Sequence, residues 1–138
     1  PSSININLSK TSILGKTFIN GEEFYIGENG KFINSSQISQ KYKTASVFGK
    51  FETNEFIKLY NNLNSQQIEI EKIDYYYYFK NRRWDLIFSN GLTLKLPSKN
   101  IIDSIKIYKK LLDNDSLTNT KIIDLRVIDQ IIMTNKNE

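Results

Sequence analysis

The chain has 138 residues and a formal net charge of +4 at pH 7, with neither cysteine nor histidine. Its length suits one domain, or one domain with part of a neighbour. The missing residue types exclude thiol nucleophiles, disulfides, Ser-His-Asp catalysis and nearly all zinc or haem ligation, so only carboxylate, Lys or Tyr chemistry is left to an enzyme.

The sequence shows no signal peptide and no apolar stretch of the length that spans a membrane. Because the chain begins at Pro1 without an initiator Met, we expect it to be a piece of a longer protein, and an anchor outside it stays open. The basic residues are scattered along the chain, which is more typical of a solvated surface than of a nucleic-acid interface.

The first quarter of the chain is predicted to be a small antiparallel β region. Apolar and polar residues alternate at its start. Asn20-Gly21 and Asn29-Gly30 are dipeptides typical of tight turns between strands. Strands are therefore predicted at 4–8, 16–19, 22–26 and 31–33. The polar stretch 35–43 is predicted to be a loop or a poorly formed helix.

Two helices are predicted further along. Thr53 can cap a helix over 54–63, and Ser98 can cap a second helix after Pro97. The second helix has its apolar face at Ile101, Ile105, Tyr108 and Leu112.

The remaining strands are predicted at 45–48, 67–73, 74–80, 83–88, 92–96, 121–127 and 130–134. Asn90-Gly91 indicates a hairpin, the last two strands are separated by a very short connection, and 135–138 is a frayed tail. The sum is an α+β fold: a mostly antiparallel β-sheet with two helices, and the C-terminal strand at the sheet edge.

Five consecutive aromatic residues occupy 75–79. In a strand, three of these rings would face one side and two the other. One interpretation is a platform that stacks on bases or sugars, helped by Lys80, Arg82 and Arg83. The simpler interpretation is that Tyr and Phe fill a two-sided sheet. We favour the simpler one, since at most about half of the rings could face one ligand.

The Asn-Arg-Arg-Trp sequence at 81–84 has two interpretations as well. It could contact phosphates, or it could be a charged bend between strands with Trp84 entering the core. We favour the bend, and keep Arg82 as a candidate contact for an acidic partner segment, because Arg beside a large aromatic is typical of interface hot spots.

Paired carboxylates are the remaining option for catalysis. The pairs are Glu22 with Glu23, Glu69 with Glu71 (predicted on one strand face), and Asp113 with Asp115. None has the apolar surroundings that would raise a pKa, so we predict that the protein is not an enzyme and needs no cofactor or metal.

The last predicted strand contains the apolar run Ile131-Ile132-Met133 and is followed only by polar residues. If it also lies last in the sheet, its outer backbone groups are unpaired. Such an edge can accept a strand from a partner, or it can be covered by a loop or simply kept short. The residues alone leave these alternatives open.

Two tracts resemble the FtsQ family of bacterial cell-division proteins (DivIB in Gram-positive bacteria). The first is RRWDLIFSNGLTLKLP at 82–97, which is similar to that family's strand–turn–strand with an Arg-Trp-Asp start and a Leu-Pro finish. The second is IIDLR at 122–126, which is similar to the family's Val-Asp-Leu-Arg stretch. Both occur in the family's order.

The resemblance implies a scaffold on the outer side of the cytoplasmic membrane, held by a single-pass anchor in the inner membrane that lies outside this chain. It implies FtsB and FtsL as protein partners, with a strand of FtsB added to the last strand, and no nucleic acid. Carried over by position, the partner-binding residues are Arg82, Val127, Asp129, Gln130, Ile131, Ile132, Met133 and Thr134. Asp124 and Arg126 would hold the sheet together instead.

The resemblance also implies a division of the chain, with 1–33 as the end of a POTRA domain and 34–138 as the FtsQ-type β domain. Some relatives have aromatic residues where this chain has Val127 and Asn135, which weakens the carry-over at those two positions. The alternative function is a basic and aromatic nucleic-acid-binding domain.

Overall fold

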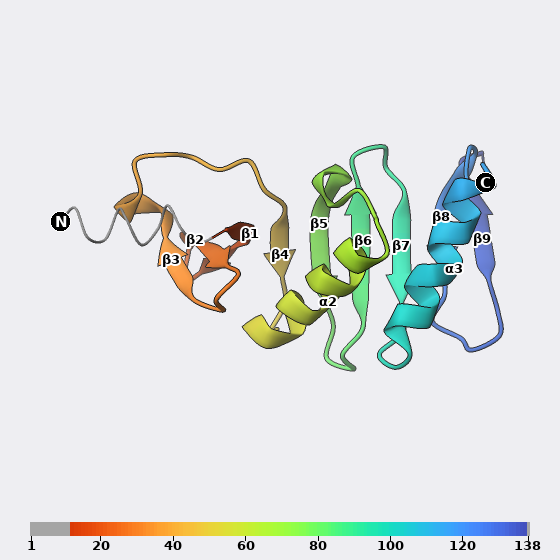
Figure 1. Cartoon of the computed structure of the whole chain (residues 1–138), viewed down its shortest axis with the longest axis horizontal. Helices are drawn as coiled ribbons and strands as arrows, with labels where there is room; N and C mark the ends of the chain where they lie inside the picture. The colour runs from red at the N-terminus through yellow and green to blue at the C-terminus, as the bar shows by residue number, and fades with distance from the viewer. Residues whose placement is uncertain (1–11, 138) are drawn as a thin grey trace.

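The computed structural model describes residues 12–137, and within them nine strands form one sheet in the order β3-β2-β1-β4-β5-β6-β7-β8-β9 (Figure 1). The strands are β1 Ile13–Ile19, β2 Glu22–Gly27, β3 Phe32–Asn34, β4 Ser46–Phe48, β5 Ile73–Tyr78, β6 Trp84–Phe88, β7 Thr93–Leu96, β8 Thr120–Asp124 and β9 Ile132–Asn135. The strand predicted at 4–8 lies outside the described residues.

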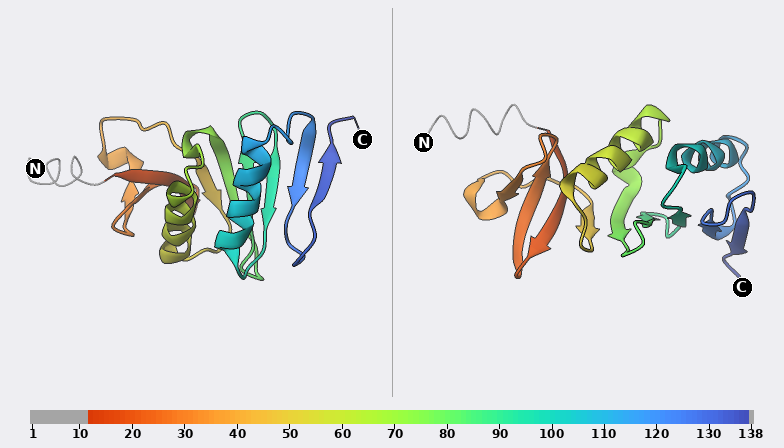
Figure 2. Two further views of the ribbon diagram at one scale, coloured as in Figure 1. Left: turned by 45° about the vertical axis from the view of Figure 1, so that its right-hand side comes forward. Right: turned by 90° about the horizontal axis from the view of Figure 1, so that it is seen from below.

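Five pairings of neighbouring strands are antiparallel and three are parallel within this range. The helices are α2 Thr53–Ser65 and α3 Ile101–Asp113, and short 3-10 turns occur at η1 Ser35–Gln37 and η2 Ile70–Lys72. Both helices lie on the same face of the sheet, and the opposite face is open (Figure 2). The predicted α+β fold is confirmed, and so is the place of the last strand at the sheet edge.

The two-residue turn between β1 and β2 shows how the sequence determines the pairing. Asn20 and Gly21 have φ of 51° and 80°, the left-handed values that a type I′ turn requires at both positions. Asn and Gly adopt these values at low cost, so this turn sets the register of Ile19 against Glu22.

The core lies between the sheet and the two helices. It contains the inward residues of the central strands, such as Leu86 and Leu94, and the inner faces of both helices, such as Phe56 and Ile105, all of them fully buried. Trp84 is buried here too, as predicted for the bend at 81–84.

The helix starts differ from the predicted ones. Glu52, not Thr53, precedes α2, and it exchanges hydrogen bonds with Glu55 in a capping box. The second helix begins at Ile101 after Asn100, which has φ of 56°, and not directly after Ser98. In both cases Thr or Ser lies nearby, but another residue takes the capping position.

The strand predicted at 67–73 is wrong over most of its length. Gln67 has a left-handed φ of 60°, and the 3-10 turn η2 follows before β5 begins at Ile73. Ile68 is nevertheless buried and Ile70 packs against the core, so the alternating apolar pattern reflects burial of a loop. Glu69 and Glu71 therefore do not share a strand face.

The last two strands are shorter than predicted. They end at Asp124 and begin at Ile132, and a seven-residue connection takes the place of a very short one. Asn135, predicted to be frayed, is part of β9. The region 12–34 continues the sheet through the parallel pairing of β1 with β4, while the assignment of 1–33 to a POTRA domain stays a prediction.

Tyr76 is fully buried, and its hydroxyl has no hydrogen-bond partner within residues 12–137. Burial raises the pKa of this hydroxyl above its ordinary value. An unpaired buried hydroxyl costs about 1–3 kcal/mol. We therefore expect Tyr76→Phe to leave the free energy of unfolding unchanged or raise it by about 1 kcal/mol in urea denaturation.

The matched control is Tyr78→Phe, in which a hydrogen bond of 2.5 Å to the Glu55 carboxylate is lost. That variant should be destabilised by about 1 kcal/mol. Equal destabilisation of both variants would show that the Tyr76 hydroxyl has a partner.

Candidate interaction edge at the C-terminal strand

β9 is an edge strand that pairs only with β8 among the described strands. Met133 lies opposite Ile123, and Ile132 opposite Asp124. Residues that lie opposite each other in an antiparallel pair point to the same face. The side chain of Met133 therefore points to the helix-covered face with that of Ile123, and the side chain of Ile132 points to the open face.

Apolar side chains are unusually exposed around this edge. Ile128 is 72% exposed and Val127 is 51% exposed. The other exposed residues of the group are Ile131, Ile132 and Met133. Exposed apolar side chains therefore lie on both faces of the sheet at this edge.

The backbone groups that face outward can be identified from the hydrogen bonds on the other side of β8. The Leu125 N–H donates to the Lys95 carbonyl of β7 at 2.9 Å. Backbone groups of successive strand residues point to opposite sides, so those of Asp124 point to β9. The backbone N–H and C=O of Ile132, which pairs with Asp124, therefore point back to β8. Those of Met133, the next residue, face the free edge.

The residues before β9 form a turn and are not part of the strand. Asp129 has φ of 64°, and the Gln130 N–H donates to the Val127 carbonyl at 3.2 Å. Together with Ile131, this turn lines a groove of about 310 Å³ against the first half of α3, where Ile107 forms part of the opposite wall. The predicted site thus consists of two adjacent parts, a turn with a groove (127–131) and a strand (132–134).

Arg82 lies elsewhere on the sheet. It is exposed and has φ of 64° in the turn between β5 and β6, where its N–H donates to the Phe79 carbonyl at 2.9 Å. This turn is at the same end of the sheet as the β8–β9 turn (Figure 1). Three strand spacings separate β6 from β9, which is roughly 14 Å, so only an elongated partner contacts both places.

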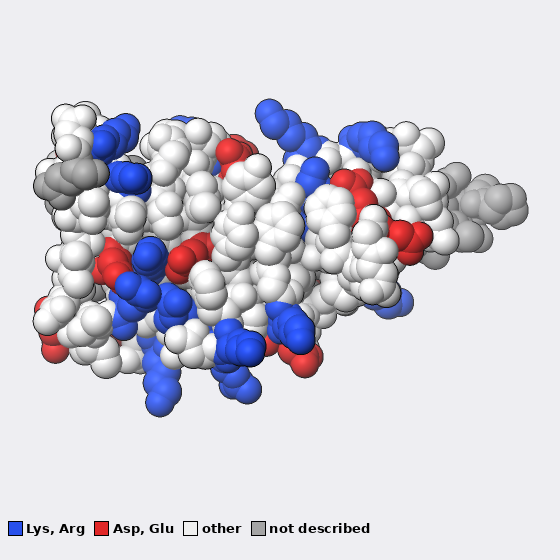
Figure 3. Space-filling view, turned by 180° about the vertical axis from the view of Figure 1, so that it is seen from behind, with Lys and Arg blue, Asp and Glu red and all other residues white. Residues whose placement is uncertain are grey.

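A group of charged residues of both signs covers the open face between these two places (Figure 3). Arg126 donates to Asp124 from Nη2 at 2.6 Å and from Nε at 2.8 Å. Arg83 lies 3.6 Å from Asp85. Lys95 lies between the two acids in the register of β6, β7 and β8. The sequence analysis gave Asp124 and Arg126 a structural role without predicting that they pair, and it missed Asp85 and Lys95. The alternation of residues along β6 and β7 could have placed these two on the same face.

The pKa values of the two acids in this group shift in opposite directions. Burial raises the pKa of Asp85, although the neighbouring cations Arg83, Lys95 and Arg126 oppose the rise. The hydrogen bond from the Arg126 side chain lowers the pKa of Asp124. The ion pair with Arg126 therefore stabilises the fold above the unfolded pKa of Asp, and this contribution is lost as the pH falls through the lower folded value.

We expect Asp124→Asn to lower the free energy of unfolding by about 1 kcal/mol at neutral pH. The difference from wild type should shrink when the pH falls below about 4, the ordinary pKa of Asp. Urea denaturation over a series of pH values measures it, with the exposed Asp115→Asn as control. A stability difference between Asp124→Asn and wild type that does not change with pH would contradict the stabilising ion pair between Asp124 and Arg126.

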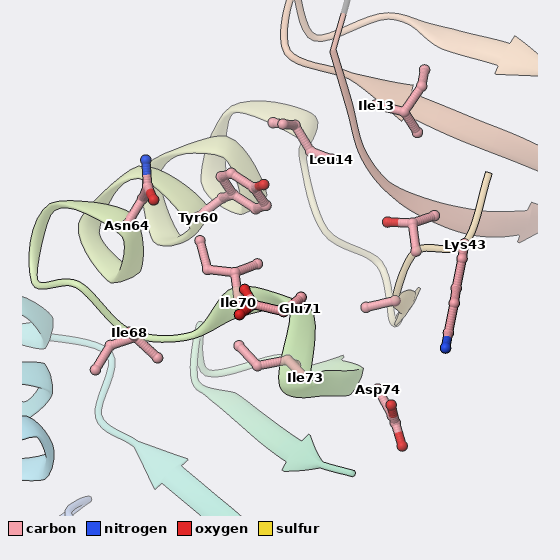
Figure 4. A pocket seen from close by; sticks show the side chains of 12 residues that line it. Ile13, Leu14, Lys43, Tyr60, Asn64, Ile68, Ile70, Glu71, Ile73 and Asp74 are labelled. Carbon is pink, nitrogen blue, oxygen red and sulfur yellow. The ribbon is translucent and has the colours of Figure 1, made fainter. Parts of the chain in front are cut away.

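A cavity of about 530 Å³ lies between β1, the segment before β4, α2 and η2. Its lining is mixed, with Tyr60 and Ile70 beside the Glu71 carboxylate (Figure 4). Glu71 and Asp74 are both exposed. Within residues 12–137, no cluster of three or more His, Cys, Asp or Glu side chains could hold a metal ion. We assign no chemistry to this cavity.

These features define a class of domain: an α+β sheet that is covered on one face and ends in an uncovered apolar edge strand. No helix within 12–137 has the length and apolar character needed to cross a bilayer. The model of the C-terminal domain of cell division protein FtsQ/DivIB matches residues 18–126, which is most of the chain. The chain belongs to the FtsQ/DivIB family of cell-division proteins.

One similar relative is the cell division protein FtsQ of Rickettsia bellii (strain RML369-C), which is 32% identical over 128 residues. That match covers 91% of this chain and 48% of the relative, so the chain spans about half the relative's length. The major extracytoplasmic domain of DivIB from Geobacillus stearothermophilus is a solved structure with a TM-score of 0.47 and 12% identity; the match covers 77% of this chain and 97% of that one.

Proposed function

We propose that this chain is the extracytoplasmic part of an inner-membrane cell-division protein whose single-pass anchor lies outside it. It works there as a non-catalytic scaffold in septum assembly and binds FtsB and FtsL, with a partner strand added to β9. The observation that carries the proposal is the free edge of β9, where the backbone groups of Met133 face outward beside exposed apolar side chains.

Strand addition uses this geometry directly. Backbone hydrogen bonds along an edge supply affinity, and neighbouring pockets for side chains supply specificity. The groove between the 127–131 turn and α3 lies on the helix-covered face and is lined by Ile131, two residues before Met133. On the open face, Ile132 and Thr134 would flank the partner's other side chains.

Arg82 contributes to the same partner only at a distance. A partner that continues from β9 across this end of the sheet passes the charged open face before it reaches the β5–β6 turn. Acidic residues on the partner would pair there with Arg82, which no acidic side chain within residues 12–137 neutralises in an ion pair. Arg82 is thus proposed as a secondary contact.

Calorimetric titration of chain 1–138 with the extracytoplasmic segments of FtsB and FtsL tests the proposal. Amide hydrogen exchange on the complex should show new protection at Met133, whose N–H gains a partner. Absence of binding, or protection confined to the opposite edge strand β3, would contradict it.

A further inference from the structure

The open face over β1, β4 and β5 contains four aromatic rings that no helix covers: Phe18, Phe48, Tyr75 and Tyr77. Phe18 and Phe48 stack with 6.4 Å between ring centroids and 11° between planes. Phe48 also stacks on Tyr77, at 5.3 Å and 24°, and on Tyr75, at 6.2 Å and 28°. We call these four rings the aromatic row.

The parity of the strands places all four rings on this face. Ser46 pairs with Lys16 and with Tyr75, and Phe48 pairs with Tyr77. The alternate residues Val47 and Tyr76 are fully buried on the helix-covered face. Phe18 is 48% exposed and Tyr75 is 42% exposed, while Phe48 and Tyr77 are half-buried. Mutual stacking therefore holds the rings in place and leaves part of their surface to solvent.

Charged residues border the aromatic row at both ends, and each carboxylate has a cation beside it. Glu23 lies opposite Phe18 and is 3.9 Å from Lys16. At the other end Asp85 lies opposite Tyr77 and is paired with Arg83. In Figure 3 the uncharged area of this face lies between two groups of charged residues of both signs.

We propose that the aromatic row binds an extended neutral glycan. The flat face of a pyranose ring presents C–H groups, which carry a partial positive charge and stack on the negative face of an aromatic ring. Several rings spaced by roughly the width of a sugar engage successive sugars of one chain. At the β1 end, the partly exposed Glu23 carboxylate and Lys16 ammonium supply hydrogen-bonding groups for hydroxyls.

Two observations favour a neutral polymer over a nucleic acid. A nucleic acid requires cations that are free to contact phosphates along its path. Here the cations that border the row, Lys16 and Arg83, each lie beside a carboxylate. The Arg83 guanidinium also lies 4.8 Å from the centre of the Phe79 ring, which further fixes its position.

The aromatic row lies over β1, β4 and β5, apart from the β9 edge at the far end of the sheet, and this inference does not rest on the proposed partner binding. The test uses chain 1–138 with three probes: the hexamer of β-1,4-linked N-acetylglucosamine, cellohexaose and a short single-stranded DNA. Ring-proton NMR shifts of the unaltered chain identify the rings that each probe contacts. We expect both hexasaccharides to shift the four rings, with affinity that does not depend on salt.

The double variant Phe18→Ser/Tyr75→Ser should bind the hexasaccharides at least tenfold more weakly. Both side chains are exposed, so the fold should tolerate the change. The matched control is Phe32→Ser, which removes a similarly exposed ring from β3 and should bind as wild type does. Met133→Pro should also retain glycan binding, which separates this site from the β9 edge.

Three outcomes would overturn the proposal. One is the absence of ring shifts with either hexasaccharide, which needs no variant. Another is equal binding by wild type and the double variant. The third is salt-dependent DNA binding that shifts these rings while the hexasaccharides do not, which would make the surface a polyanion site.

Discussion

Replacing Met133 by proline is expected to abolish strand addition at β9 and to change the free energy of unfolding by less than about 1 kcal/mol. The Met133 N–H faces the free edge, so proline removes a donor that only the partner uses, and its ring obstructs the approaching strand. The side chain of Met133 is 38% exposed, so little packing is lost. Calorimetry with the FtsB segment should show affinity reduced at least tenfold, about 1.4 kcal/mol.

The neighbouring residue is the matched control. The Ile132 N–H faces β8, so Ile132→Pro removes a hydrogen bond of the β8–β9 ladder and should destabilise β9 itself. Amide exchange on the two free variants distinguishes them, because only Ile132→Pro should accelerate exchange in β8. Wild-type affinity for the partner in a folded Met133→Pro variant would refute strand addition at this edge.

Replacing Gly49 by alanine is expected to lower the free energy of unfolding by about 3 kcal/mol or more. Gly49 has φ of +106°, and an added Cβ would overlap the backbone carbonyl oxygen of Tyr78. Backbone atoms of β5 cannot give way as a flexible side chain can, so strain and overpacking add together.

Gly21→Ala is the control for the backbone conformation alone. Gly21 has φ of +80°, and a Cβ there meets no atom within 4 Å among the described residues. Gly21→Ala should lower the free energy of unfolding by about 1 kcal/mol. Chemical denaturation of both variants measures the difference, and similar losses would show that the contact with Tyr78 is relieved at no cost.

Much of the sheet could be predicted because its signals are local. Asn20-Gly21 determines a type I′ turn, and alternation of apolar residues predicts the buried faces of β6 and β7. The edge position of β9 followed from its place at the end of the chain and from its apolar run. These features depend on residues that are close together in the sequence, so a single sequence is enough to recognise them.

The errors occur where burial does not require a strand. At 67–73 the apolar pattern is real, but the left-handed Gln67 and the 3-10 turn bury Ile68 and Ile70 without strand pairing. At 125–131 four of the seven residues are apolar, and yet the chain forms a turn in which Asp129 takes a left-handed conformation. Propensity does not reveal these choices, because η2 lies against α2 and the 127–131 turn lies against α3.

The sequence located the candidate site only in outline. It could not show which amides of β9 face outward, because that depends on the pairing of β8 with β7. The rings of the tyrosine run alternate between the two faces as predicted, with Tyr76 buried and Tyr75 exposed, but both helices cover the same face, so no second layer buries the outward rings. Tyr76 entered the core as expected, but Tyr75 and Tyr77 joined Phe18 and Phe48, residues distant in sequence.

The weak attachment of β9 has a consequence for the lifetime of the protein. Its four residues are all at least partly exposed, and it pairs with one strand, so it should open locally far more often than the central strands. Proteases cleave such transiently opened ends. A bound partner strand would place β9 in the sheet interior and suppress this opening. We therefore expect proteases to cleave unoccupied copies at β9 and occupied copies to persist.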